Sequence, residues 1–182
     1  MHFAGDTESA LVFAASLVNT ARGGAELLPD QEELTRFLDA DRWTGRRDGT
    51  PEELTAVRAL RPRLRKFWEA AGVDDAVEVV NTLLLESGAR PRLTRHDDLG
   101  WHLHVTADDS PLVDRMAAEA AMGVLDLIRT DEFSRLRWCE APDCEAVFVD
   151  LSRNRSKRYC DTGNCGNRAH VAAYRARKSG AS

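Results

Sequence analysis

The four cysteines of the chain carry its clearest chemical pattern. They are Cys139, Cys144, Cys160 and Cys165, which form two C-x4-C pairs separated by fifteen residues. Each pair can form a turn that presents two thiolates, and two such turns complete the tetrahedron that Zn²⁺ prefers. Because all four ligands would come from the protein, the spacing predicts a structural zinc site with no open position for a catalytic water.

The sequence leaves two other uses of these cysteines open. Iron–sulfur clusters also take four thiolates, although more often from tighter and uneven runs. Free or disulfide-paired cysteines in a core would need apolar neighbours, whereas Glu140, Asp143 and Asn164 beside the pairs favour turns. A segment of about 45 residues also buries too little apolar area to fold without a metal or another cross-link. Zn²⁺ is therefore the cofactor that we predict.

Charge is distributed unevenly along the chain and indicates a polyanionic partner. The 182 residues carry a formal net charge of -5. Residues 151–182 alone contribute +7, so the remainder carries -12. A basic end on an acidic body is typical of a nucleic-acid-binding segment. The candidate DNA contacts are Arg153, Arg155, Lys157, Arg158, Arg168, Arg175 and Lys178.

Small secondary-structure elements must position the cysteines. Residues 146–149 predict a strand, and residues 169–178 predict a helix after the last cysteine. We expect Gly166 to adopt a positive φ beside a sulfur and Asn167 to cap the helix. The apolar helix residues that we expect to pack on the core of this module are Val171 and Tyr174.

The first 130 residues are predicted to be mostly helical. Asp30 and Thr50 each stand three residues before a glutamate, which is the spacing of a capping box. Ser110 is the expected cap of the last long helix, and Pro62 predicts a kink within the third. These patterns predict several amphipathic helices that pack together.

Residues 91–106 alternate apolar and polar side chains, which predicts a β-hairpin with its turn at residues 97–100. The chain is therefore expected to be an α+β protein that is mainly α-helical. We predict a helical N-terminal domain with a β-hairpin over residues 1–130. A small C-terminal four-cysteine zinc finger, made of a β-hairpin and a helix, is predicted over residues 135–178.

Residues 135–178 resemble the CGNR zinc-finger family, named for the four residues that are here 165–168. The resemblance includes the SRNRS stretch at 152–156 and the YRAR stretch at 174–177. The preceding body resembles the ABATE domain of stress-induced transcription regulators, on the LVNT stretch at 17–20 and the hairpin before the last helix. The resemblance implies a bacterial DNA-binding regulator.

Two further groups of residues could form sites. Asn19, Thr20 and Arg22 at the end of the first helix are candidate effector-binding residues, although capping and hydrogen bonding between helices are a simpler role. His102 and His104 alternate along a predicted strand and share a face, which fits a metal site or a pH sensor, or simply the polar face of the hairpin. No catalytic dyad, activated nucleophile or phosphate-binding loop is present, so we do not expect an enzyme.

The sequence thus predicts a cytoplasmic, zinc-dependent, DNA-binding transcription regulator with a candidate effector-sensing N-terminal domain. Its apolar stretches are too short to span a membrane, and the reducing cytoplasm favours metal ligation over disulfides. The expected partners are DNA, a small-molecule effector and a second copy of the chain, although no heptad seam is visible. The alternatives are a zinc-stabilised protein-interaction or RNA-binding module, or a small-molecule sensor with an autoinhibited finger.

Overall fold

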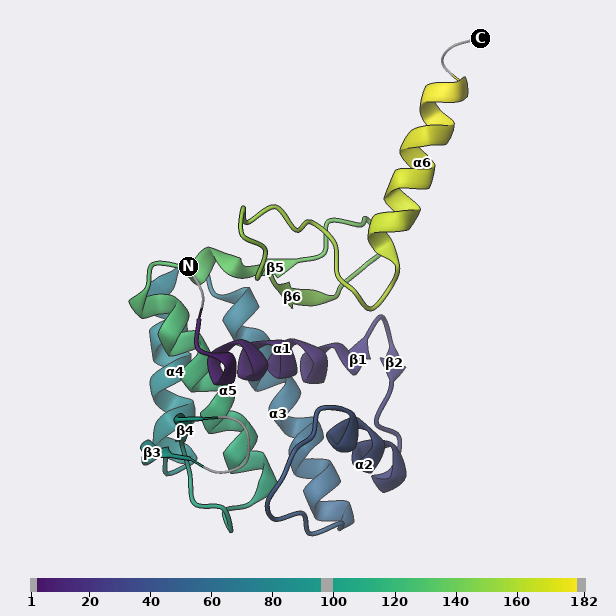
Figure 1. Ribbon diagram of the computed structural model, residues 1–182. Helices are drawn as coiled ribbons and strands as arrows, with labels where there is room; N and C mark the ends of the chain where they lie inside the picture. Colours follow the sequence, from purple (N-terminus) through teal and green to yellow (C-terminus); the bar gives the residue numbers. More distant parts are fainter. Residues whose placement is uncertain (1–2, 96–99, 180–182) are drawn as a thin grey trace.

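The computed structural model describes residues 3–95 and 100–179, which form a helical body with a small cysteine-containing finger above it (Figure 1). The α+β, mainly α-helical class is confirmed. No helix among the described residues is long and apolar enough to cross a membrane. The helices of the body are α1 Gly5–Asn19, α2 Gln31–Ala40, α3 Pro51–Glu69, α4 Val73–Glu86 and α5 Leu112–Arg129.

Two short antiparallel hairpins interrupt the helices of the body. The first joins β1 (Ala21–Arg22) to β2 (Ala25–Glu26), directly after α1. The second joins β3 (Arg92–Thr94) to β4 (His102–His104), as the alternating pattern predicts. Most of the expected turn of this second hairpin, residues 97–99, lies outside the described residues.

Two predicted caps fix where α2 and α3 begin. The Asp30 carboxylate accepts a hydrogen bond from the backbone N–H of Glu33 at 2.9 Å. The Thr50 hydroxyl accepts one from the N–H of Glu53 at 3.2 Å. These contacts satisfy amide groups that have no partner within the helix, so both capping boxes are confirmed on this side.

Of two other predictions about helices, the cap at Ser110 is wrong and the kink at Pro62 stays a prediction. Ser110 does not cap α5, because Pro111 occupies the N-cap position and no side chain caps that end. Pro62 lies inside α3, which continues through it from Pro51 to Glu69. The carbonyl of Arg58, to which Pro62 cannot donate, accepts a hydrogen bond from Nε of Arg61 at 3.3 Å instead.

The core of the body forms around α5, which packs against α1, α3 and α4. Gly123 allows α1 to approach closely, because a Cβ atom at this position would lie 3.0 Å from Cγ of Leu11. Nearby, the Thr7 hydroxyl donates to the Asp126 carboxylate at 2.6 Å. The first and last helices of the body are thereby held in direct contact.

The finger consists of the predicted β-hairpin and helix. After one turn of 3-10 helix, β5 (Leu136–Trp138) pairs antiparallel with β6 (Val147–Val149), and α6 (Cys165–Ser179) follows the last cysteine. Figure 1 shows α6 projecting away from the body. Only the first turn of α6 therefore lies near the cysteines.

The hairpin of the finger is part of the main apolar core. Val147 and Val149 are buried in the same cluster as the core residues of the body. Nε1 of Trp68 donates to the carbonyl of Phe148 at 3.0 Å, and Nε1 of Trp138 donates to the carbonyl of Trp68 at 2.9 Å. Because the two parts share buried side chains and hydrogen bonds, we expect them to fold together.

Candidate metal centre and nucleic-acid interface

The four cysteines converge at one point between the β5–β6 hairpin and α6. Their sulfur atoms all lie within 4.8 Å of one another, and none is in a disulfide. Sγ of Cys160 lies 3.7 Å from Sγ of both Cys144 and Cys165. A tetrahedral Zn²⁺ site with bonds of about 2.3 Å requires sulfur atoms about 3.8 Å apart. The cysteines are thus positioned to hold a metal ion.

Short backbone turns present the sulfur atoms. The N–H of Cys144 donates to the carbonyl of Ala141 at 3.0 Å, which closes the turn of the first pair. The N–H of Cys139 donates to the carbonyl of Ala146 at 2.9 Å and extends the hairpin to the metal site. The N–H of Cys160 donates to Sγ of Cys139 at 3.4 Å, which links the two pairs.

The second turn differs from the prediction at Gly166 and Asn167. The residue with a positive φ is Asn164, at 51°, and Gly166 is not among the glycines in that region. The close approach to sulfur occurs at Gly163, where a Cβ atom would lie 2.9 Å from Sγ of Cys165. Asn167 is not a cap, because α6 begins at Cys165. The CGNR residues therefore form the first turn of the helix.

Without a metal ion, the thiols of Cys139, Cys144 and Cys160 have shifted pKa values. Burial raises the pKa of Cys144 to about 12 and also raises that of Cys139. Burial acts in the same direction on Cys160, but hydrogen bonds from Thr162 and the backbone of Gly163 outweigh it and hold its pKa at about 7. Four thiolates this close together repel one another, so a divalent cation is needed to stabilise them.

Arg168 connects the metal site to an acidic side chain. Its Nη2 lies 3.2 Å from Sγ of Cys165, and its two Nη atoms lie 2.6 Å and 3.2 Å from the Asp143 carboxylate. The contacts with Cys165 and Asp143 raise the pKa of the guanidinium. Side chains that contact ligand atoms fix ligand orientation and tune a metal site, so the structure places this candidate DNA contact beside the cysteines.

The basic residues between the cysteine pairs lie on an ordered loop, residues 151–158, which we call the basic loop. Asp150 is fully buried below it and accepts hydrogen bonds from the N–H groups of Ser152 and Lys157, both at 2.9 Å. Nη1 of Arg135 donates to the carbonyl of Asp150 at 2.6 Å. Sequence reasoning missed Asp150, although an aspartate two residues before a serine is a known turn signal.

Several candidate DNA contacts form ion pairs with acidic residues of the finger and the segment before it. Arg155 lies 2.7 Å from Glu132, Lys157 lies 2.5 Å from Asp161, and Nε of Arg158 lies 2.6 Å from Glu140. Apart from Arg168, which pairs with Asp143, no such pair is found within the described residues for the remaining candidates. These are Arg153, Arg175 and Lys178, all of them exposed.

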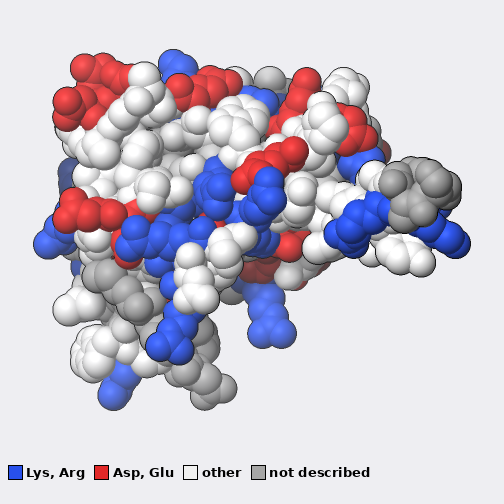
Figure 2. Space-filling model, turned by 90° about the horizontal axis from the view of Figure 1, so that it is seen from above, with Lys and Arg blue, Asp and Glu red and all other residues white. Residues whose placement is uncertain are grey.

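The finger side of the molecule carries these charges on one face. In the view from above, Lys and Arg side chains gather near the centre and on the projecting helix, with Asp and Glu side chains beside them (Figure 2). Helix α6 contains no acidic residue. Val171 and Tyr174 are exposed on it, so the prediction that they pack on the core of the finger is wrong.

The candidate effector residues lie where the body meets the finger. Asn19 is buried and forms two hydrogen bonds to the backbone of Val147, at 2.8 Å and 2.9 Å. The Thr20 hydroxyl donates to the carbonyl of Leu17 at 2.7 Å, and Arg22 lies in β1. Asn19 and Thr20 thus form structural hydrogen bonds, as the simpler role in capping and in contacts between elements requires. The effector role of Asn19, Thr20 and Arg22 stays a prediction.

The two histidines of β4 face a cavity in the body. His102 and His104 are partly buried, with ring centroids 5.1 Å apart. Nδ1 of His104 lies 2.9 Å from Oδ1 of Asp108. Among the described residues, the cysteines are the only group of three or more ligand atoms close enough to hold a metal ion. The geometry therefore does not favour the histidine pair as a metal site.

Comparison with known proteins gives two family matches. The model described as "CGNR zinc finger" matches residues 135–178, and the ABATE model, described as "Putative stress-induced transcription regulator", matches residues 11–131. Neither description names an enzyme activity. No curated protein matches the chain. Since the ABATE match covers more than half of the chain and the finger match includes all four clustered cysteines, the chain belongs to the ABATE family and carries a CGNR zinc finger.

Proposed function

We propose that this protein is a cytoplasmic transcription regulator that binds Zn²⁺ through its four cysteines and contacts DNA through the finger. The observation that carries the proposal is the projection of α6 from an acidic molecule (Figure 1). The helix has no acidic residue, and Arg175 and Lys178 on it are exposed without ion pairs among the described residues. A helix with side chains is about as wide as the major groove of DNA.

The identity of the metal follows from the ligand set. Four thiolates at tetrahedral spacing favour Zn²⁺ over hard cations such as Mg²⁺ or Ca²⁺, which take oxygen ligands. With four protein ligands the ion has no open position, so its role is to hold the β5–β6 hairpin and the first turn of α6 together. The ion thereby orients the remainder of α6.

The candidate DNA contacts form two groups, according to whether they already form ion pairs within the protein. Arg153, Arg175 and Lys178 can approach phosphates without breaking an ion pair within the described residues, and Arg177 on α6 adds a fourth such charge. The remaining candidates in the basic loop are paired, so DNA must compete with carboxylates for them. These paired residues are Arg155, Lys157 and Arg158. Arg168 supports the metal site and positions α6.

The proposal is tested by charge reversal on α6. Duplexes are first selected from a random library by the metal-loaded protein at a stated salt concentration. Reversing Arg175 and Lys178 to Glu should lower the affinity for those duplexes by at least about 100-fold, because two phosphate contacts become repulsive. A matched control reverses Lys66 and Arg90, which are exposed basic residues of the body, and should leave affinity within about threefold.

Metal content is measured for both double variants, because it separates a lost contact from a lost fold. The proposal expects full metal content in each. It is rejected if the wild-type protein binds no duplex, or if the two double variants bind equally well. A stronger interaction with single-stranded RNA of the same length would instead favour the RNA-binding alternative.

A further inference from the structure

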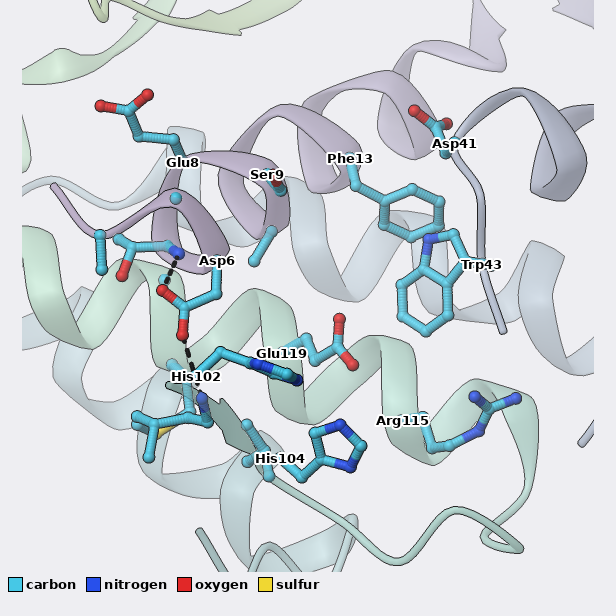
Figure 3. Close-up of a pocket in the computed structure, with 18 of the residues that line it drawn as sticks. Asp6, Glu8, Ser9, Phe13, Asp41, Trp43, His102, His104, Arg115 and Glu119 are labelled. Carbon is cyan, nitrogen blue, oxygen red and sulfur yellow. Dashed lines mark hydrogen bonds between the residues drawn. The ribbon is translucent and has the colours of Figure 1, made fainter. Parts of the chain in front are cut away.

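A cavity of about 930 Å³ opens in the body between α1, β4, α5 and the loop of residues 41–45 (Figure 3). Its volume is within the range of small-molecule binding sites. None of the predicted effector residues lines it. The cavity is therefore a separate candidate site, made by elements far apart in the sequence.

One wall of the cavity is aromatic. Phe13 of α1 and Trp43 of the loop lie in contact, with ring centroids 4.6 Å apart, and both line the cavity. Trp101 also lines it and is 68% exposed, so its ring is accessible at the rim. Aromatic faces of this kind bind apolar groups and attract organic cations.

Arg115 holds the loop that carries Trp43. Nη1 of Arg115 donates to the carbonyl of Thr44 at 2.5 Å, and its Nη2 donates to the carbonyl of Arg46. At Gly45 a Cβ atom would lie 2.7 Å from Nη1 of Arg115, and φ is +79°, so the loop needs glycine there. The guanidinium of Arg115 thus bonds to backbone carbonyls, and its Cζ also lies 5.8 Å from the centroid of the Trp43 ring. Its buried Nε has no acceptor among the described residues.

Acidic side chains also line the cavity. Asp6, Glu8, Asp41 and Asp126 line the cavity, together with Glu119 from α5. Asp6 and Asp126 already accept hydrogen bonds from neighbouring residues. These acids do not converge on one point. Among the described residues, only the cysteines form a group of three or more ligand atoms close enough to hold a metal ion. Dispersed carboxylates fit an organic cation better than a metal ion.

Glu119 is the carboxylate best placed to meet such a cation. It is partly buried and has no hydrogen bond with the described residues. Figure 3 shows its carboxylate directed toward the same space as the rings of His102, His104 and Trp43. Burial is the main cause that raises its pKa to about 7; the positive charge of Arg115 opposes this shift, and the charge of Asp6 adds to it. A bound cation would offset this cost of ionisation.

We propose that this cavity binds an organic cation, an amine or quaternary ammonium group on an aromatic or apolar body. The cationic group pairs with Glu119, and the body lies against Trp43 and Phe13. Leu151, the first residue of the basic loop, also lines the cavity. Any effect on DNA rests on the proposed function, whereas binding of the cation does not.

The test compares three probes that share a phenylethyl group by isothermal titration calorimetry with the full-length, metal-loaded protein at pH 8. They are 2-phenylethylamine, which is a cation, 2-phenylethanol, which is neutral, and 3-phenylpropionate, which is an anion. The cation should bind at least about tenfold more tightly than the alcohol, since a charge-assisted hydrogen bond contributes about that factor. The anion should bind most weakly.

Two variants locate the site. Glu119→Gln should remove the preference for the cation, whereas Glu78→Gln, which changes an exposed glutamate on α4, should keep it. Trp101→Ala changes an exposed rim residue and should weaken all three probes without affecting the fold. The proposal is overturned if the alcohol or the anion binds as tightly as the cation, if no probe binds, or if Glu119→Gln retains the preference. None of these outcomes depends on DNA binding.

Discussion

The side chain of Asn19 binds the backbone of Val147 at both of its polar groups. Nδ2 of Asn19 donates to the carbonyl at 2.8 Å, and Oδ1 accepts from the N–H at 2.9 Å. Both residues are buried, and they are 128 positions apart. The last residue of α1 thus provides hydrogen-bond partners for the backbone N–H and carbonyl of Val147 in β6. This contact links the ABATE helices to the finger.

This contact predicts a large loss of stability for Asn19→Ala. The change leaves two buried backbone groups without partners, so the free energy of unfolding should fall by about 2 to 4 kcal/mol. The matched control is Asn81→Ala on α4, where the side chain is exposed and the expected change is within about 0.5 kcal/mol. Urea denaturation measures both variants. Equal effects would show that the contact contributes nothing.

Metal removal should expose every thiol of the chain. The protein has four cysteines, all in the cluster, so a thiol reagent should react with none of them in the metal-loaded protein and with four after chelation. The melting temperature should fall at the same time. A colourless protein with one zinc ion would exclude an iron–sulfur cluster. Rapid reaction of any cysteine before chelation would contradict the four-thiolate site.

Arg168 and Arg175 lie on the same helix but should have different roles. Arg168→Ala removes a contact with Sγ of Cys165 and should lower zinc affinity by about 10-fold to 100-fold. Arg175→Ala should leave zinc affinity unchanged and weaken DNA binding. Competition with a chromogenic chelator measures the first property. If both variants bind zinc like the wild type, Arg168 has no role in the metal site.

Glu119 should make stability depend on pH. Its pKa rises from 4.5 to about 7 on folding, so between these pH values the folded protein binds more protons than the unfolded chain. The free energy of unfolding therefore falls as pH rises through this window. At pH 8, Glu119→Gln should be more stable than the wild type by about 1 to 3 kcal/mol, and at pH 4.5 the difference should disappear.

The wild-type protein and Glu119→Gln differ only at residue 119, so the comparison contains its own control. The neighbouring groups Asp6, His102, His104 and Arg115 are present in both proteins, so the difference between the stabilities of the two proteins at each pH isolates Glu119. A difference that is constant from pH 4.5 to pH 8 would contradict the role assigned to this carboxylate.

Local features of the fold could be predicted because they depend on neighbouring residues. The caps at Asp30 and Thr50 and the alternating hairpin are set within a few positions. The four-cysteine cluster was predictable for a related reason, since regular spacing is enough to predict a metal site. The helix start at Cys165 was missed because the residue with positive φ is Asn164, before the last cysteine.

Contacts between distant residues could not be predicted in this way. Nothing near Asn19 in the sequence identifies Val147 as its partner, and Trp68 gives no local sign that it bonds β6. The sequence also does not show which basic residues form ion pairs with acidic residues. Glu132 and Asp143 are close to Arg155 and Arg168 only in the folded chain. Long-range packing, which no local pattern encodes, therefore decides which charges are available.

The most direct test of the central claim is DNA affinity of the zinc-loaded protein as a function of salt concentration. Four basic residues, Arg153, Arg175, Arg177 and Lys178, have no ion pair among the described residues. The logarithm of the binding constant should therefore fall against the logarithm of salt concentration with a slope of roughly -3 to -4. Replacing Arg175 and Lys178 by Ala should reduce this slope by about 2. A slope near zero, or the same slope in both proteins, would contradict binding of DNA through α6.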